Sequence, residues 1–270
     1  MCESEKWVIL YSILGAIFLI LFFYYGLYII PDLRAFTPKL PGYRSSQILF
    51  LVSLFLRAVG YIVWAALFKD HRDDNSAIIS TIFCGIPGYV LTISYCLIFF
   101  LWCTILANLI LNDSSNYFKK IGFWSFAIGL VIVIMCIILI IVVILTDKNN
   151  YGNYEVSLAI GRDILTALVF IYFCSDMIKK HKKPMNTLST ASTLSWLSIC
   201  LIISLIIRAI STVLYRWAPS FGFKNGKPDY GTGSFINTLI AQLVGEIIPC
   251  FLISINRKKS GLLSVYDEFD

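Results

Sequence analysis

The sequence predicts an all-α integral membrane protein whose single domain, residues 1–270, is a bundle of seven transmembrane helices. Three observations lead to this fold class. The chain is 58% hydrophobic and only 14% charged, whereas soluble domains carry roughly 25% charged residues, and its mean hydropathy is +0.80. Seven separate apolar runs have the length of about 20 residues that a helix needs to cross the hydrocarbon core. Polar and apolar residues do not alternate as they do in membrane β-barrels.

Most of these runs contain about 20–25 residues, which at 1.5 Å per residue is enough for a bilayer about 30 Å thick. The first run is too long for a signal-peptide core and lacks a small-residue cleavage site, so we expect an uncleaved anchor. The third run is longer and contains Pro87, which predicts that it starts with a luminal or a kinked turn. The expected spans are Trp7–Ile30, Gln47–Phe68, Ile82–Leu111, Ile121–Leu145, Val156–Ile178, Leu194–Tyr215 and Phe235–Ile255, followed by a short tail over 256–270.

Lysine and arginine residues are distributed unequally between the two sides of the predicted bundle. The loops after the first, third, fifth and seventh spans hold twelve of them, and the amino terminus with the remaining loops holds seven. Because cytosolic loops are enriched in Lys and Arg, we predict that the N-terminus is outside or luminal and the C-terminal tail is cytosolic. The Asn-x-Ser sequon at Asn112 then lies in a cytosolic loop and should carry no glycan.

Five ionisable residues lie inside the predicted spans, namely Arg57, Arg162, Asp163, Arg208 and Glu246. A charge at the bilayer centre costs about 2.5–3.5 kcal/mol on insertion scales, so we expect these side chains to face the bundle interior. Their depths predict an intramembrane polar network of Arg57, Arg208 and Glu246, with Asp163 nearby and Arg162 at the same level as Asp163. The network is either a clamp that fixes helix packing, or an ion path or ligand pocket. The sequence favours the clamp because no proton-relay chain is visible.

Pro249 follows Glu246 by three residues. It removes the N–H group that would bond to the carbonyl oxygen of Gly245. We therefore expect the seventh helix to kink beside Glu246, and either Arg57 or Arg208 to satisfy the freed carbonyl.

Basic residues gather at the cytosolic ends of the fifth and seventh spans. They form a predicted basic rim that attracts anionic lipid or an acidic partner protein at about 1 kcal/mol per charge, although topology alone also accounts for them. We expect no nucleic-acid binding, because most basic residues of the chain are spread over short loops. The rim consists of Lys179, Lys180, Lys182, Lys183, Arg257, Lys258 and Lys259.

The sequence lacks the motifs of common enzymes and of rhodopsin-class receptors. It contains no Walker loop, no Ser/His/Asp set and no His/Glu metal cluster, so we expect a non-enzymatic protein without a cofactor or a metal. The seventh span contains no lysine for a retinal Schiff base and no Asn-Pro-x-x-Tyr, and no Asp-Arg-Tyr-like triplet closes the third span. The internal repeats of many transporters are also not visible.

Motifs in four spans have the order and spacing of a known family. They are Leu56-Arg57-Ala58-Val59, then Ile86-Pro87-Gly88-Tyr89 with Ser94-Tyr95 and Trp102, then Ile207-Arg208, and finally Val244-Gly245-Glu246-Ile247-Ile248-Pro249. On these motifs, residues from about Ser46 to Lys259 resemble the tobamovirus-multiplication family of plant seven-pass proteins and their animal orphan-receptor-like lysosomal relatives. The chain departs from the plant members at Thr104, where they tend to carry an acid.

The resemblance implies a GPCR-like bundle on a vacuolar or endolysosomal membrane that acts through cytosolic protein contacts, with Arf-like or Rag small GTPases as partners. Tyr266-Asp-Glu-Phe269 in the tail fits a Tyr-x-x-bulky-apolar sorting signal; the plasma membrane is the alternative location. Two functions therefore remain open. The first is a scaffold or regulator that recruits small GTPases or trafficking proteins. The second is a divergent seven-pass receptor in which Arg57, Arg208 and Glu246 form a two-state lock.

Overall fold

Within its described residues the chain has seven helices that are long and apolar enough to cross a membrane, as the sequence predicts. The computed structural model describes residues 3–35, 43–68, 81–110, 115–145, 148–180, 189–218, 223–224, 227–228 and 231–259. The spans begin and end within about one helical turn of the predicted positions. They are Glu5–Ile30, Tyr43–Leu67, Thr81–Ala107, Tyr117–Leu145, Tyr154–Lys179, Ser192–Trp217 and Thr232–Asn256.

Two of the spans are built from more than one element, because the third span begins with a π-helical turn and another π-helical turn interrupts the seventh. The third span is η1 with α4, and the seventh is α8, η3 and α9. A two-stranded antiparallel hairpin, which the sequence did not predict, follows α7. In chain order the elements are α1 (Glu3–Ala35), α2 (Tyr43–Phe68), η1 (Thr81–Gly85), α4 (Ile86–Ile110), α5 (Ser115–Leu145), α6 (Lys148–Lys180), α7 (Ser189–Trp217), β1 (Phe223–Lys224), β2 (Lys227–Pro228), α8 (Thr232–Gln242), η3 (Leu243–Ile247) and α9 (Ile248–Lys259).

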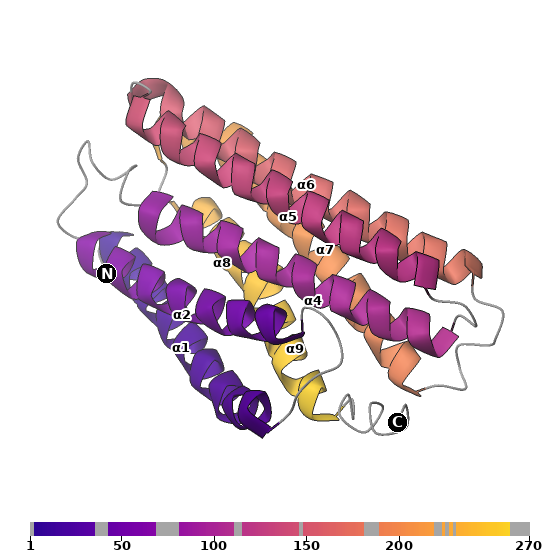
Figure 1. Cartoon of the computed structure of the whole chain (residues 1–270). Coiled ribbons are helices and arrows are strands. Elements are labelled where there is room, and N and C mark those ends of the chain that lie inside the picture. The colour runs from indigo at the N-terminus through magenta and orange to yellow at the C-terminus, as the bar shows by residue number, and fades with distance from the viewer. Residues whose placement is uncertain are drawn as a thin grey trace.

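The helix α4 is the centre of the bundle. It packs against α2, α5, α6 and α7, and Figure 1 shows it between the α1–α2 pair and the α5–α6 pair. In the third span 78% of the most apolar stretch is buried, against 17% in the span of α5. A helix that is apolar on all sides is buried in a large protein or faces lipid, and these two helices represent the two cases.

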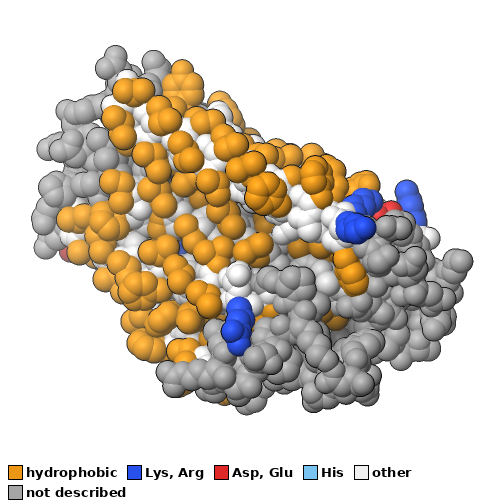
Figure 2. Space-filling model, viewed as in Figure 1, with side chains coloured by type: hydrophobic (Ala, Val, Ile, Leu, Met, Phe, Trp, Pro, Cys, Tyr) orange, Lys and Arg blue, Asp and Glu red, His pale blue; other side chains and the backbone are white. Residues whose placement is uncertain are grey.

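The outer surface of the bundle is apolar. Leu27, Phe126 and Ile144 each have more than 70% of their surface exposed. Figure 2 shows hydrophobic side chains along the visible face, with few charged ones among them. Soluble monomers rarely expose a contiguous apolar patch larger than a few hundred Å². This surface is therefore suited to the hydrocarbon of a membrane.

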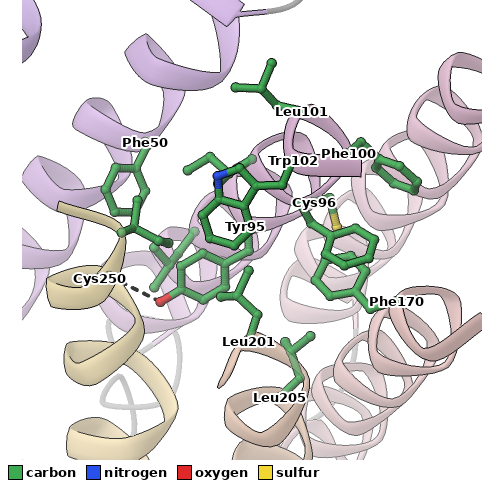
Figure 3. Close-up of a cluster of buried hydrophobic side chains, with 14 of the residues drawn as sticks. Phe50, Tyr95, Cys96, Phe100, Leu101, Trp102, Phe170, Leu201, Leu205 and Cys250 are labelled. Carbon is green, nitrogen blue, oxygen red and sulfur yellow. Dashed lines mark hydrogen bonds between the residues drawn. The ribbon is translucent and has the colours of Figure 1, made fainter. Parts of the chain in front are cut away.

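An apolar core surrounds the middle of α4 and adjoins the polar groups of the interior. Phe99 of α4 stacks on Phe170 of α6, with ring centroids 3.8 Å apart. Figure 3 shows Tyr95 of α4 directed at Cys250 of α9, and the Tyr95 hydroxyl lies 3.2 Å from Cys250 Sγ. The same hydroxyl donates a hydrogen bond of 3.1 Å to the backbone carbonyl of Glu246. Tyr95 therefore links α4 to the interrupted seventh span.

Replacing Tyr95 by Phe is expected to lower the free energy of unfolding by about 0.5–1.5 kcal/mol, the net value of a typical hydrogen bond. The ring still fills its site, but the Glu246 carbonyl loses the hydroxyl donor. Thermal unfolding of the detergent-solubilised chain measures the change. Tyr154→Phe is the matched control, because Tyr154 is 51% exposed; equal effects of the two substitutions would contradict the assigned hydrogen bond.

Candidate functional site

Five ionisable side chains from four elements meet inside the bundle. We call them the polar cluster, and each has at most 5% of its surface exposed. The sequence predicted an intramembrane network of these same five residues, and the structure places them in contact with one another. The polar cluster consists of Arg57 from α2, Arg162 and Asp163 from α6, Arg208 from α7 and Glu246 from η3.

Arg57 holds three elements together. Its Nη2 donates to Glu246 Oε1 in a buried ion pair. Its Nη1 donates to the backbone carbonyl of Cys84 in η1 at 2.6 Å. The guanidinium also lies 5.4 Å from the ring centroid of Tyr61, within the range of a cation–π interaction. One side chain thus connects α2 to both π-helical turns.

Arg208 lies between the two acids of the polar cluster. Its Nη2 is 3.2 Å from Asp163 Oδ1, and its Nε is 4.0 Å from Glu246 Oε1. Arg162 Nε donates to the same Asp163 oxygen at 2.8 Å, and its guanidinium lies 4.5 Å from the ring centroid of Tyr89. Each carboxylate is therefore shared by two guanidinium groups.

A proline follows each π-helical turn after one intervening residue, at Pro87 and Pro249. Proline lacks the N–H group that would continue the helical hydrogen bonds, and π-helical turns occur frequently at functional sites. The two groups that bind Arg57, the carbonyl of Cys84 and the carboxylate of Glu246, come from these turns. The irregular turns before both prolines therefore position the two acceptors of Arg57.

The carbonyl freed by Pro249 has a different partner from the predicted one. We expected Arg57 or Arg208 to satisfy the Gly245 carbonyl, and this expectation was wrong. Ser204 Oγ of α7 donates to it at 2.6 Å. The two guanidinium groups are instead held by carboxylates, which are stronger acceptors than a neutral carbonyl.

Two glycines leave the space through which the arginines pass. A Cβ atom on Gly245 would lie 2.3 Å from Arg208 Cγ, and one on Gly88 would lie 3.1 Å from Arg57 Nη2 and 3.5 Å from Arg162 Nη1. Any larger residue would displace these side chains or press against them. Nothing in the sequence alone indicates which side chains the two glycines make room for.

A cavity of about 300 Å³ adjoins the polar cluster. It lies in the half of the bundle where α1 begins, and its walls include the rings of Tyr61 and Tyr89. Glu155, on the same wall, is half-buried and accepts a hydrogen bond from Thr81 Oγ1 at 3.5 Å. Ligand pockets have volumes of about 300–1,000 Å³. The cavity is thus large enough for a small ligand.

Several buried atoms on the cavity wall have no hydrogen-bond partner among the described residues. Arg57 Nε and Arg208 Nη1 are donors, Asp163 Oδ2 and Glu246 Oε2 are acceptors, and the Tyr89 hydroxyl can be either. An unsatisfied buried polar group costs about 1–3 kcal/mol, and more when it is charged. These atoms are therefore suited to bind a polar molecule in the cavity. The sequence predicted that the charged side chains face the interior, but it did not predict the cavity's size or the presence of Glu155 on its wall.

An unpredicted ion pair outside the polar cluster lies at the opposite end of the bundle. Lys120 Nζ of α5 is 2.9 Å from Asp176 Oδ2 of α6 and 4.8 Å from the ring centroid of Tyr172. The two charged side chains are 30% and 20% exposed. Pairs as accessible as this one contribute about 0–1 kcal/mol, so it serves as a reference for the buried pairs.

The other predicted site residues lie mostly outside the described part of the chain. Lys179, near the end of α6, is exposed. The basic rim and the sorting signal stay predictions. The side chains outside the described part are those of Lys180, Lys182, Lys183, Arg257, Lys258, Lys259, Tyr266 and Phe269.

No family model, curated protein or solved structure matches the chain. Among the described residues, no group of three or more His, Cys, Asp or Glu side chains is placed to hold a metal ion. Guanidinium, carboxylate and phenol groups line the cavity.

Proposed function

We propose that the chain is a receptor-like seven-helix membrane protein whose polar cluster changes partners when a ligand enters the cavity. The proposal depends on one observation: the Arg57–Glu246 ion pair both lines the cavity and joins α2 to η3. A ligand shifts a conformational equilibrium only if it binds the two states unequally. A ligand in this cavity would contact the ion pair directly, which supplies such a difference.

Arg208 provides the second arrangement that a two-state lock requires. Its Nε lies 4.0 Å from the Glu246 oxygen that Arg57 holds. If Arg57 turned toward a ligand, a movement of about 1 Å would bring Arg208 within hydrogen-bond distance of Glu246. Removing one partner of a buried ion pair costs about 3–5 kcal/mol. An exchange of partners avoids most of that cost because the acid stays paired.

The proposed orientation places the cavity on the non-cytosolic side. Twelve lysines and arginines on the opposite side, against seven on this one, support it. The cavity lies at the end where α1 begins, and seven crossings bring α9 to the other end. A ligand would then enter from outside or from an organelle lumen. Cytosolic proteins would bind the opposite ends of the helices and detect their rearrangement.

A second candidate function is the scaffold that the family resemblance implies, on a vacuolar or endolysosomal membrane with Arf-like or Rag GTPases as partners. One observation favours it. The residues that carry the resemblance include Arg57, Arg208 and Glu246, and Tyr95 binds the backbone of Glu246. The motifs thus form one structural unit, as expected if the cluster defines the family. The proposed receptor function instead predicts heterotrimeric G proteins as partners.

Proximity labelling from the C-terminus is the experiment that separates these functions. For a receptor, Glu246→Gln is expected to change the set of labelled proteins while the chain stays on the same membrane. For a scaffold, Arf-like or Rag GTPases are labelled with and without the substitution. Asp176→Asn is the control for the loss of a carboxylate outside the polar cluster. Co-imaging with organelle markers determines the location, and labelling of luminal proteins alone would contradict the proposed orientation.

A further inference from the structure

We propose that the cavity binds a small organic acid, whose carboxylate bridges Arg57 and Arg162 above Gly88. This inference rests on the proposed receptor function and adds the chemical class of the ligand. It follows from the balance of charge on the cavity wall, the convergence of two guanidinium groups on one point, and the unsatisfied atoms that surround that point.

The charge of the inner cavity is positive. Arg57, Arg162 and Arg208 face two fully buried acids, Asp163 and Glu246. A buried charge without a counter-charge is strongly unfavourable. One negative charge from a ligand would balance the third guanidinium.

The excess of one guanidinium holds for the fully buried groups of the wall. Glu155 also lines the cavity, but its carboxylate is half-buried, so water partly solvates its charge, and it accepts a hydrogen bond from Thr81. The other titratable groups on the wall are the phenols of Tyr11, Tyr61, Tyr89 and Tyr215 and the thiol of Cys84, which are neutral when protonated. The inner cavity thus favours one anionic group.

The two guanidinium groups converge where Gly88 has no side chain. The point at which a Cβ would stand is 3.1 Å from Arg57 Nη2 and 3.5 Å from Arg162 Nη1. Both nitrogens therefore lie within reach of the two oxygens of one carboxylate, since charge-assisted hydrogen bonds are about 2.7–2.9 Å long. Gly88, Arg57 and Arg162 all line the cavity, so a carboxylate that stands over the glycine meets no side chain of residue 88.

The size of the cavity and its acceptors narrow the ligand further. A single water occupies about 30 Å³ of liquid volume, so a cavity of about 300 Å³ exceeds what an inorganic ion needs. The unsatisfied oxygens Asp163 Oδ2 and Glu246 Oε2 require donors. A carboxylic acid that also carries a hydroxyl group meets both demands, whereas chloride meets only the first.

Thermal unfolding of the full chain in detergent, with lactate as the probe, tests the inference. Lactate is expected to raise Tm by about 2–5 °C at about ten times its Kd, and acetate by less because it lacks the hydroxyl. Lactamide, the neutral isostere of lactate, and sodium chloride at equal ionic strength should produce no shift. No shift with either carboxylate, or equal shifts with lactamide or chloride, would overturn the proposal.

Two glycine variants locate the effect. Gly88→Ala places a methyl group between the two guanidinium groups and is expected to abolish the lactate shift. Gly85→Ala, at the same wall, adds a Cβ with only ordinary contacts of 3.4–3.8 Å and should retain it. Should Gly88→Ala not fold, Arg162→Gln tests the same bridge. A persistent lactate shift in the variant that folds would overturn the assigned position.

These results are independent of the receptor test. If Glu246→Gln alters proximity labelling but lactate gives no shift, the receptor function stands and the ligand class is wrong. If lactate stabilises the wild type through Gly88 but Glu246→Gln leaves labelling unchanged, the carboxylate site stands and its role in switching is wrong.

Discussion

Replacement of Glu246 by Gln is expected to lower the free energy of unfolding by about 3–5 kcal/mol, the cost of removing one partner from a buried ion pair. Gln keeps the shape of the side chain, so the packing of η3 is preserved. Arg57 loses its paired charge, and Arg208 loses the carboxylate that lies 4.0 Å from its Nε. In thermal unfolding of the detergent-solubilised chain, Tm should fall by at least about 6 °C.

The double variant shows whether the loss arises from the pair itself. Arg57→Ala should lower stability by a similar amount, and Glu246→Gln combined with Arg57→Ala should cost clearly less than the sum of the two. Full additivity would mean that the two side chains do not interact. Asp176→Asn is the matched control, because its pair with Lys120 is partly exposed and should contribute only about 0–1 kcal/mol.

The seven spans and the meeting of the embedded charges follow from the sequence because both depend on transfer from water to hydrocarbon. A run of about 20 apolar residues has one stable arrangement in a bilayer, the helix. An ionised side chain such as Arg208 in the middle of such a run is stable only where a counter-charge faces it. The rise per residue predicts Arg57 and Glu246 near the middle of their helices and Arg208 about five residues toward the outside. The structure brings both arginines to Glu246.

The pairing within the polar cluster does not follow from the sequence. The rise per residue gives the depth of Arg162 and Asp163 but not the rotation of α6 about its axis, which depends on packing against α4 and α7. The π-helical turns add a further difficulty. One extra residue in a turn rotates every residue after it about the helix axis. The directions of the Glu246 side chain and the Cys84 carbonyl therefore cannot be predicted from the geometry of a regular helix.

Proline and glycine are where local sequence and site geometry agree. Pro87 and Pro249 lie just beyond the two π-helical turns. Gly88 directly follows Pro87, and Gly245 lies within η3. Each glycine is in contact range of a guanidinium-bearing side chain. In this chain, a proline with a nearby glycine in an apolar span therefore marks a place where the backbone and an arginine approach closely.

Gly60→Ala is expected to be the most harmful glycine substitution in the described chain. A Cβ at Gly60 would lie 1.9 Å from the carbonyl oxygen of Phe83 and 3.1 Å from its carbon. The obstacle is backbone, which cannot rotate away as a side chain can. The helix α2 and the turn η1 must separate, which stretches the 2.6 Å hydrogen bond from Arg57 to Cys84. Overpacking costs about 1–3 kcal/mol, occasionally more, and we expect a loss of about 3 kcal/mol or greater.

Gly129→Ala is the matched control for Gly60→Ala, since its Cβ would meet nothing within 4 Å. There the better helix propensity of alanine should leave stability unchanged or raise it by up to about 1 kcal/mol. The two substitutions add the same methyl group to a transmembrane helix, so a fall in Tm for Gly60→Ala alone is caused by the contact between α2 and η1. If Gly60→Ala were as stable as the wild type, α2 and η1 would have to lie farther apart. The hydrogen bond from Arg57 to the Cys84 carbonyl would then be absent. Without it, the Arg57 guanidinium would lose a contact that fixes it in the position above Gly88 that carboxylate binding requires.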